Sequence, residues 1–400
     1  MFGSVYTGLT GMMTFSRGLD VISNNVSNLN TPGYKANDLL FQDLFYNYRM
    51  ASESGTNNPG SEIGNGVTGD RTVMREGQGE ISQTGNSTDI AIDGNGFFIL
   101  RDGSDIYYTR AGQFEIDEEG YLVDRTNQAR VAGFEDGDLI DINVDSLGNN
   151  RPQATTEIIL TNNLSSEATE HVVNNVEIYD ALGASHIINL TFTNEESSWR
   201  VTVTDEQDNE IASGGEIRFQ ADGSPDDGFN RYNFEFAPEG VNSTDILLNF
   251  GEPGSFTGVT SFATGENSEL KVDSQDGYPS GSLIQLGFDR DGTLTAEYSN
   301  GKDDESTQLA LAWFDDIQAL RQIGSGLFLA GEGNEPTIDV PLQGVMGEIV
   351  EKSLELSNVD LTLEFTDLII MQRGFQGSSQ ILTTANEMMQ QLLDMGQGSR

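Results

Sequence analysis

Both ends of the chain carry apolar residues at the seven-residue spacing of a coiled coil, and a long Gly-rich, strand-like stretch separates them. A seven-residue repeat predicts a helix that buries one narrow stripe against another helix. We therefore expect two terminal helices whose stripes form an assembly seam. The seam residues are Phe2, Val5, Leu9, Met12, Leu19, Val26 and Leu29 near the start, and Leu361, Leu368, Met371, Phe375, Leu382, Ala385, Met389 and Leu392 near the end.

The first helix is too weakly apolar to be stable alone. Ordering residues 2–29 costs roughly 30 to 60 kcal/mol, at about 1 to 2 kcal/mol per residue. Burying the stripe returns only roughly 12 to 24 kcal/mol, and each glycine within the helix costs about 1 kcal/mol relative to alanine. The two ends could pair within one chain as a two-helix stalk, which leaves most of each helix in water. Neighbouring copies are therefore the better source of burial, and the glycines would let their backbones approach closely.

The chain is strongly acidic, with 64 acidic and 20 basic residues and a formal net charge of -44. Nucleic acid and anionic membrane surfaces bind clusters of Lys and Arg, so both are poor partners for this acidic chain. The excess acid lies in the middle of the chain, whereas residues 1–50 are neutral overall. Two explanations stay open: adaptation to high salt, which screens self-repulsion, and an ordinary acidic surface protein.

Composition argues against catalysis, metals and cofactors. The chain has no cysteine, and His171 and His186 lack regularly spaced acidic neighbours, so we expect no metal site. The Asp-Gly segments near Asp93 and Asp289 are typical of hairpin turns rather than calcium loops. No apolar run is long enough to cross a bilayer, and the start lacks a basic segment followed by an apolar one. We therefore expect a protein that is not an enzyme, is not inserted in a membrane and has no cleaved secretory signal peptide.

The order of patterns along the chain predicts a nested, mainly β protein. Pro32 and Gly33 end the first helix and suit a type II turn. From about residue 72 the period changes to two, with frequent turn residues, as in an all-β domain. If the terminal helices meet, the last β block must complete the domain that the first one begins. The expected parts are helices at 1–30 and 355–400, an arm and flexible connector at 31–71, an inner β domain at 72–150 with 285–354, and an inserted outer β domain at 151–284.

Several motifs in fixed order resemble the bacterial flagellar rod and hook family of axial proteins. Residues 23–36 read SNNVSNLNTPGYKA, which is similar to that family's amino-terminal signature. Residues 91–98 and 108–114, AIDGNGFF and YTRAGQF, resemble its shared central motif, and residues 357–361, 371–376 and 382–389 resemble its carboxyl-terminal motifs. The matching motif residues at the start are Asn24, Asn25, Asn28, Asn30, Thr31, Pro32, Gly33 and Tyr34. The resemblance spans nearly the whole chain and is greatest to hook members, because rod members generally lack the second β domain.

The resemblance implies a structural subunit that is exported unfolded through a type III gate and polymerises outside the cell. The polymer would be a curved, flexible tube that transmits motor torque to the filament and encloses an export channel. Implied partners are other copies of the chain, the rod, the hook cap and the hook-filament junction proteins. The polar face of the last helix is the expected channel lining, and it comprises Arg373, Gln376, Gln380, Thr383, Glu387 and Gln390.

Two other functions stay open from the sequence. One is a distal rod or other axial protein of the hook-basal body, which belongs to the same family. The other is a β-rich secreted hydrolase or adhesin, since chance pairs of carboxylates are common in so acidic a chain.

Overall fold

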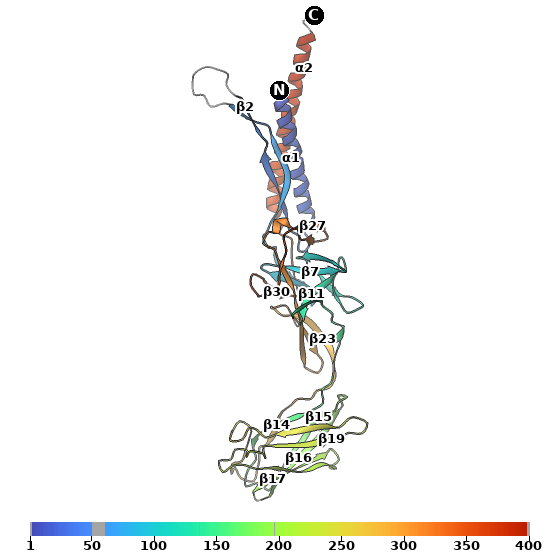
Figure 1. Ribbon diagram of the computed structural model, residues 1–400, viewed down its shortest axis with the longest axis vertical. Coiled ribbons are helices and arrows are strands. Elements are labelled where there is room, and N and C mark those ends of the chain that lie inside the picture. The colour runs from blue at the N-terminus through green and yellow to red at the C-terminus, as the bar shows by residue number, and fades with distance from the viewer. Residues whose placement is uncertain (1, 50–60, 136, 196, 398–400) are drawn as a thin grey trace. The chain divides into compact units, whose positions relative to one another are not determined.

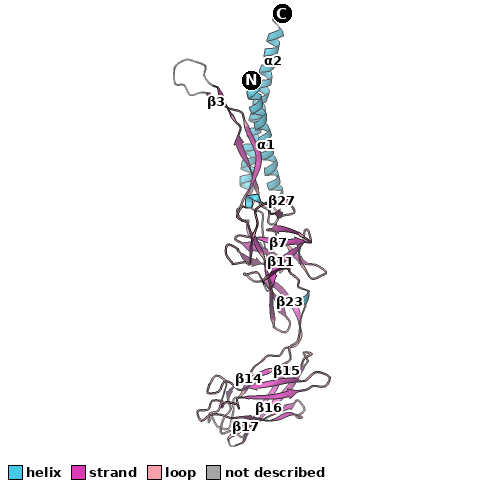
Figure 2. Ribbon diagram, in the orientation of Figure 1, coloured by secondary structure: helices cyan, strands magenta, loops and turns pink. Residues whose placement is uncertain are grey.

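The computed structural model describes residues 2–49, 61–135, 137–195 and 197–397. An α-helix lies at each end of the sequence, and the chain between them is mainly strand (Figure 2). This confirms the predicted fold class. The chain divides into two compact units: unit 1 is Met1–Asp145, Leu286–Thr295 and Glu305–Arg400, and unit 2 is Ser146–Gln285 and Ala296–Asp304.

The terminal helices are shorter than their predicted segments. Helix α1 covers Phe2–Ser27 and α2 covers Leu361–Gln397. The predicted turn after α1 is present: the Tyr34 amide donates to the Thr31 carbonyl at 3.3 Å, and Gly33 has a φ of 67°. The expectation of helix from residue 355 is wrong. Strand β31 covers Ser353–Glu355, and the Asp360 side chain then accepts the Thr362 amide at 2.8 Å as the cap that starts α2.

The predicted flexible connector is also wrong over residues 61–70, where the chain forms strands. Strand β1 (Asn37–Asp43) pairs antiparallel with β4 (Val67–Met74), and β2 (Tyr46–Arg49) pairs with β3 (Ser61–Gly64). The small residues of this segment allow close packing against α1. A methyl group at Gly69 would lie 2.6 Å from Thr14 Cγ2, so the hairpin can rest on α1 only where a side chain is missing. Residues 50–60 of the predicted connector lie outside the described residues.

The β part of unit 1 is built around one sheet in which β25, β11, β7, β8, β28 and β27 are neighbours in that order. Figure 1 labels β7, β11 and β27 of this sheet. Two further pairs join the beginning and end of the chain, β6 with β30 and β5 with β31. The strands and the short helix are β5 (Ile81–Gln83), β6 (Ile90–Asp93), β7 (Phe97–Asp102), β8 (Asp105–Thr109), β9 (Phe114–Ile116), β10 (Leu122–Asp124), β11 (Arg130–Glu135), β12 (Asp138–Asp141), β25 (Asp303–Leu309), β26 (Leu311–Trp313), η2 (Ile317–Ala319), β27 (Arg321–Gly324), β28 (Leu327–Leu329), β29 (Thr337–Asp339) and β30 (Glu348–Glu351).

Aromatic side chains fill the core of this β part. Phe97 lies 5.4 Å from Phe328 and 6.0 Å from Phe314, measured between ring centroids, and Tyr108 lies 4.8 Å from Phe314. The tilted and edge-to-face geometry is the one that aromatic quadrupoles favour. These residues come from both halves of the discontinuous unit, so its two halves must fold together.

Unit 2 consists of two sheets that share one apolar core. One sheet has the order β19, β20, β14 and β21, with β22 also paired to β14, and the other has the order β15, β16, β17 and β18. Alternate residues of β16, namely Ile188, Leu190 and Phe192, are fully buried, as expected for a strand with one face in the core. The elements are β13 (Asn149–Asn150), β14 (Glu157–Asn163), β15 (Glu170–Tyr179), β16 (Ser185–Glu195), β17 (Ser198–Asp205), β18 (Glu210–Ile217), β19 (Arg231–Phe236), β20 (Thr244–Asn249), β21 (Val259–Thr260) and β22 (Lys271–Gln275). The unit boundaries fall within the short helix η1 (Asp145–Leu147) and within β23 (Gly281–Phe288), β24 (Thr293–Tyr298) and β25.

Neither helix is long and apolar enough to cross a membrane, as judged from the residues that the structure describes.

Candidate assembly interface

The two helices of unit 1 lie side by side and antiparallel, and glycines form the contact (Figure 1). A methyl group at Gly11 would lie 2.8 Å from Ser378 Oγ, and one at Gly374 would lie 2.4 Å from the Phe15 ring. Each glycine therefore leaves room for a larger side chain of the other helix. The facing pairs are Gly8 with Ile381, Gly11 with Ser378, Phe15 with Gly374, Gly18 with Met371 and Asn25 with Glu364.

This pairing changes the interpretation of the apolar stripe in α1. The fully buried face is made of small and polar residues together with one isoleucine: Gly8, Gly11, Thr14, Gly18, Ile22 and Asn25. The predicted seam lies beside that face. Val5, Met12, Leu19, Val26 and Leu29 are half-buried and Leu9 is exposed, while nothing is described of the Phe2 side chain. A contact centred on the α1 stripe is thus wrong for the pairing within one chain, because glycines allow the closer approach.

In α2 the stripe residues do face α1. Leu368, Met371, Phe375, Leu382 and Met389 are half-buried and Ala385 is buried, whereas Leu361 and Leu392 at the two ends are exposed. All six residues of the expected channel lining are exposed on the opposite side of the helix. The structure therefore separates an α1-facing stripe from a polar face on α2.

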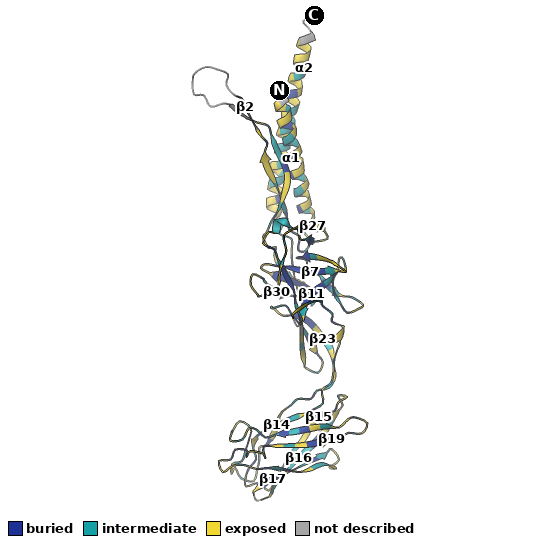
Figure 3. Cartoon of the chain, in the orientation of Figure 1, coloured by how far each residue is buried: buried dark blue, intermediate teal, exposed yellow. Residues whose placement is uncertain are grey.

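A second apolar face of α2 stays largely exposed among the described residues of the chain, although Ile381 at its edge lies beside Gly8 of α1. It is exposed by 45% at Leu363, 56% at Ile370 and 50% at Ile381, and Met388, Leu392 and Met395 continue it. Much of α2 is coloured as exposed in Figure 3. The facing pairs place Phe2 opposite about residue 387, so α2 continues past the start of α1 for about ten residues or 15 Å. Tyr6, Leu9 and Met13 make a similar exposed face on α1. Apolar faces of this kind mark contact sites with other proteins.

Asn25 holds the bases of both helices to the hairpin. Its Nδ2 donates to the Glu364 carboxylate at 3.2 Å and to the Asn37 carbonyl at 2.9 Å, and its Oδ1 accepts the Asn37 amide at 3.0 Å. Glu364 is fully buried and pairs with Arg75 at 2.8 Å. Hydrogen bonds to Asp38 raise the pKa of Arg75 above its ordinary value. The negative charges of Asp38 and Glu364 raise it by smaller amounts. The buried charge is thus fully paired, as burial requires.

Most other residues of the asparagine-rich motif shape the turn after α1. Asn24 Nδ2 donates to the Tyr34 hydroxyl at 3.1 Å, and Thr31 Oγ1 donates to Asn28 Oδ1 at 3.1 Å. The Gly33 amide donates to the Glu355 carbonyl at 2.8 Å, and a methyl group there would lie 2.4 Å from the Ala111 amide nitrogen. Pro32 is half-buried and Asn30 is exposed. The motif therefore docks the end of α1 on the β part rather than contributing a reactive group.

A buried ion triad ties the same turn to the β strands. Lys35 Nζ lies 2.6 Å from one Glu355 oxygen, and Arg110 lies 3.3 Å from the other. Burial lowers the pKa of Lys35 and of Arg110, while the Glu355 carboxylate opposes that shift in both. Removing one member of such a group leaves an unpaired buried charge.

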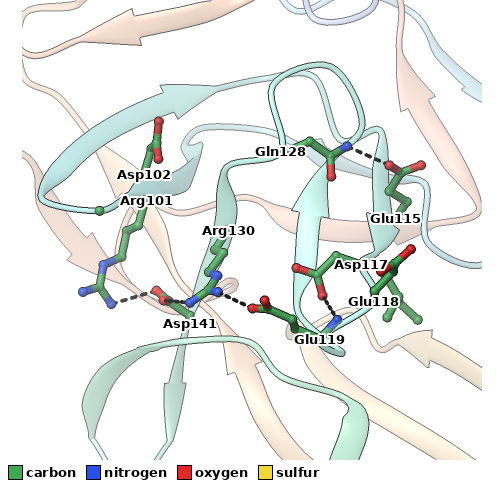
Figure 4. A pocket seen from close by; sticks show the side chains of 11 residues that line it. Arg101, Asp102, Glu115, Asp117, Glu118, Glu119, Gln128, Arg130 and Asp141 are labelled. Atoms are coloured by element: carbon green, nitrogen blue, oxygen red, sulfur yellow. Dashed lines mark hydrogen bonds and ion pairs between the residues drawn. The ribbon is translucent and has the colours of Figure 1, made fainter.

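A surface depression of about 960 Å³ lies on unit 1 and has no catalytic arrangement (Figure 4). Carboxylates and two arginines line it, and Arg101 and Arg130 both pair with Asp141, at 2.9 and 3.7 Å. No histidine, lysine or serine borders it. No group of acidic or histidine side chains with metal-binding geometry occurs in the described part of the chain. Both histidines have structural partners, the Leu270 carbonyl for His171 and Asp180 for His186.

Comparison with known sequences decides the family. Four family models match in chain order: "Flagella basal body rod protein" over residues 5–35, "Flagellar hook protein FlgE/F/G D1 domain" over 91–163, "Flagellar basal body protein FlaE D2 domain" over 143–278 and "Flagellar basal body rod FlgEFG protein C-terminal" over 350–395. The flagellar hook protein FlgE of Treponema pallidum is 30% identical over 99% of this chain and 100% of its own length. The chain belongs to the flagellar hook protein family. It is thus a hook subunit, a member of a structural and not an enzymatic family.

Other members of the hook family agree with this assignment. The hook protein of Borreliella burgdorferi is 28% identical over 98% of this chain and 99% of its own length. The crystal structure of Helicobacter pylori flagellar hook protein FlgE2 covers 68% of this chain and 100% of its own chain, with a TM-score of 0.50 and 14% sequence identity. At that identity the similarity supports the fold alone.

Sequence reasoning missed the two buried charge clusters. Lys35 was visible as one of few lysines, next to a turn motif, but its partner Glu355 is 320 residues away. The spacing of glycines in α1 is the sequence signal for the helix contact. The sequence predicts that these glycines let neighbouring copies approach closely, whereas the structure places the close approach between α1 and α2 of one chain.

Proposed function

We propose that this hook subunit polymerises through its helix pair into the inner wall of a curved tube that transmits motor torque to the filament. The observation that supports this most is the exposed apolar face of α2, which continues past the start of α1. Burying the exposed half of its six large side chains contributes about 5 to 9 kcal/mol for each copy. The half-buried stripe of α1 borders the same pair and adds to the seam.

The proposal extends to export and location. The subunit passes through the type III gate as an unfolded chain, assembles outside the cell, and contacts rod, cap and hook-filament junction proteins at the ends of the tube. Helices that gain most of their burial from neighbours suit this route, because they cost little to keep unfolded during passage. The polar face of α2, from Arg373 to Gln390, lines the channel through which later subunits pass.

A charge on the apolar face of α2 should prevent assembly. In Leu392→Glu the carboxylate replaces a side chain that no part of α1 covers, so the monomer should keep its fold. We expect the critical concentration for polymerisation to rise at least tenfold, which corresponds to about 1.4 kcal/mol. Sedimentation and electron microscopy of purified protein measure this.

Gln391→Glu is the matched control, because it adds the same charge to the neighbouring exposed residue. It should assemble within about twofold of the unchanged chain, as surface changes usually have small effects. Equal assembly of the two variants would argue against the apolar face as a contact.

The channel assignment predicts a separate effect on export. Replacing Gln376 and Gln380 by leucine makes an exposed polar face of α2 apolar, so unfolded chains that pass along it should bind to it. We expect hooks to assemble and to keep their stability, while secretion of later subunits falls several-fold in cells. Secretion assays and hook thermal stability measure the two effects, and unchanged secretion would remove these residues from the channel.

A further inference from the structure

Phe45 is the most exposed large apolar side chain among the described residues, at 90% of its full exposure. It follows β1, where the hairpin passes toward β2 (Figure 1). The adjacent Leu44 amide donates to the Gly66 carbonyl at 2.9 Å, so the backbone is held at this point. Folding buries almost none of this phenyl ring, so its apolar surface is available for burial against another molecule.

A pocket of about 340 Å³ in the same unit suits such a ring. It lies where the end of α1 meets β27 and β28, and Leu327 and Phe328 form its apolar floor, exposed by 9% and 2%. Gly33, Gly324 and Gly326 keep its walls open. Carboxylates border the two larger pockets, whereas no carboxylate borders this one. Of the three, this pocket offers a phenyl ring the least polar surroundings.

The chain cannot fill this pocket with its own Phe45. A methyl group at Gly66 would lie 2.3 Å from Thr10 Oγ1, so the hairpin beside Phe45 lies at the level of Thr10 on α1. The pocket begins at Asn24, fourteen residues further along the same helix, which is about 21 Å. That distance is several times the reach of one side chain.

We propose that Phe45 of one copy inserts into the pocket between α1 and β28 of a neighbouring copy. Because the copies polymerise, the contact is heterologous and repeats from copy to copy rather than closing a dimer. This inference rests on the proposed polymerisation and names one lateral contact of the tube. It is separate from the α2 face, which lies on another part of the surface.

The cysteine-free chain allows a direct test. Copies carrying Phe45→Cys are mixed with copies carrying Gln322→Cys at the rim of the pocket, assembled, and treated with a short bismaleimide. Each copy holds one thiol, so every cross-linked dimer joins two copies. We expect dimers between positions 45 and 322 at least tenfold above a mixture of Leu182→Cys with Gln322→Cys, where Leu182 is 71% exposed on unit 2.

Each outcome decides between the two proposals. Tubes without enriched 45–322 dimers would overturn this contact and leave polymerisation standing. Failure of the unsubstituted chain to form tubes would overturn both. If Phe45→Cys alone blocks assembly, Gln322→Trp, which fills the pocket and leaves Phe45 itself in place, must block it too, and tubes from Gln322→Trp would refute the contact.

Discussion

Glu355→Gln should destabilise unit 1 by about 3 to 5 kcal/mol, the cost of leaving a buried charge unpaired. The Glu355 side chain is 1% exposed and pairs with both Lys35 and Arg110. Glutamine keeps the shape but leaves two buried cations beside a neutral amide. Urea titration followed by Trp313 fluorescence in a Trp199→Phe background measures unit 1, because Trp313 is the remaining tryptophan and lies in β26.

The stability lost in Glu355→Gln should be smaller at alkaline pH. Burial already lowers the pKa of Lys35 below its ordinary value of 10.5, and removal of Glu355 lowers it further. Between that lowered pKa and 10.5 the unfolded chain binds a proton that the folded variant has released, so stability of the variant rises with pH relative to the unchanged chain.

Glu351→Gln is the control for this prediction. Glu351 pairs with Lys352 at 3.1 Å, but the two side chains are 51% and 36% exposed. An exposed pair contributes about 0 to 1 kcal/mol, so this variant should unfold almost as the unchanged chain does. Equal losses in both variants would show that the triad does not support the fold as we describe.

Gly374→Leu should separate the two helices. A methyl group at this position would already meet the Phe15 ring at 2.4 Å, and Phe15 also contacts Phe41 at a centroid distance of 5.6 Å, which restricts its movement. Overpacking costs about 1 to 3 kcal/mol. We expect the helical circular dichroism signal to be lost at a lower temperature, in monomer and in polymer. We also expect the critical concentration for polymerisation to rise at least tenfold.

Gly377→Leu distinguishes packing from helix propensity. Nothing lies within 4 Å of a methyl group at Gly377, three residues further along the same helix. Leucine there should stabilise α2 by about 1 kcal/mol, because glycine is the poorer helix former. If both leucines had the same effect, close approach at Gly374 would not be the cause.

The sequence predicted the elements well where local chemistry decides them. Pro32 and Gly33 end α1 in the expected turn, the stripe of Phe375 and Leu382 faces α1, and β6 to β9 form where short strands separated by turns are expected. It failed at residues 61–70, because glycines that allow contact with α1 have the same composition as a flexible linker. Apart from these residues and the start of the last helix, the bounds of the four expected parts stay a prediction.

The period of the apolar residues, the turn residues and the ordered motifs are local properties, and by themselves they determined the helices, most strands and the family of this protein. Only the tertiary structure decided which face of α1 is buried and that Lys35 meets Glu355 across 320 residues. The physical reason is that burial depends on what lies opposite. A glycine becomes a contact, and a lysine becomes half of an ion pair, only when a distant segment packs against it.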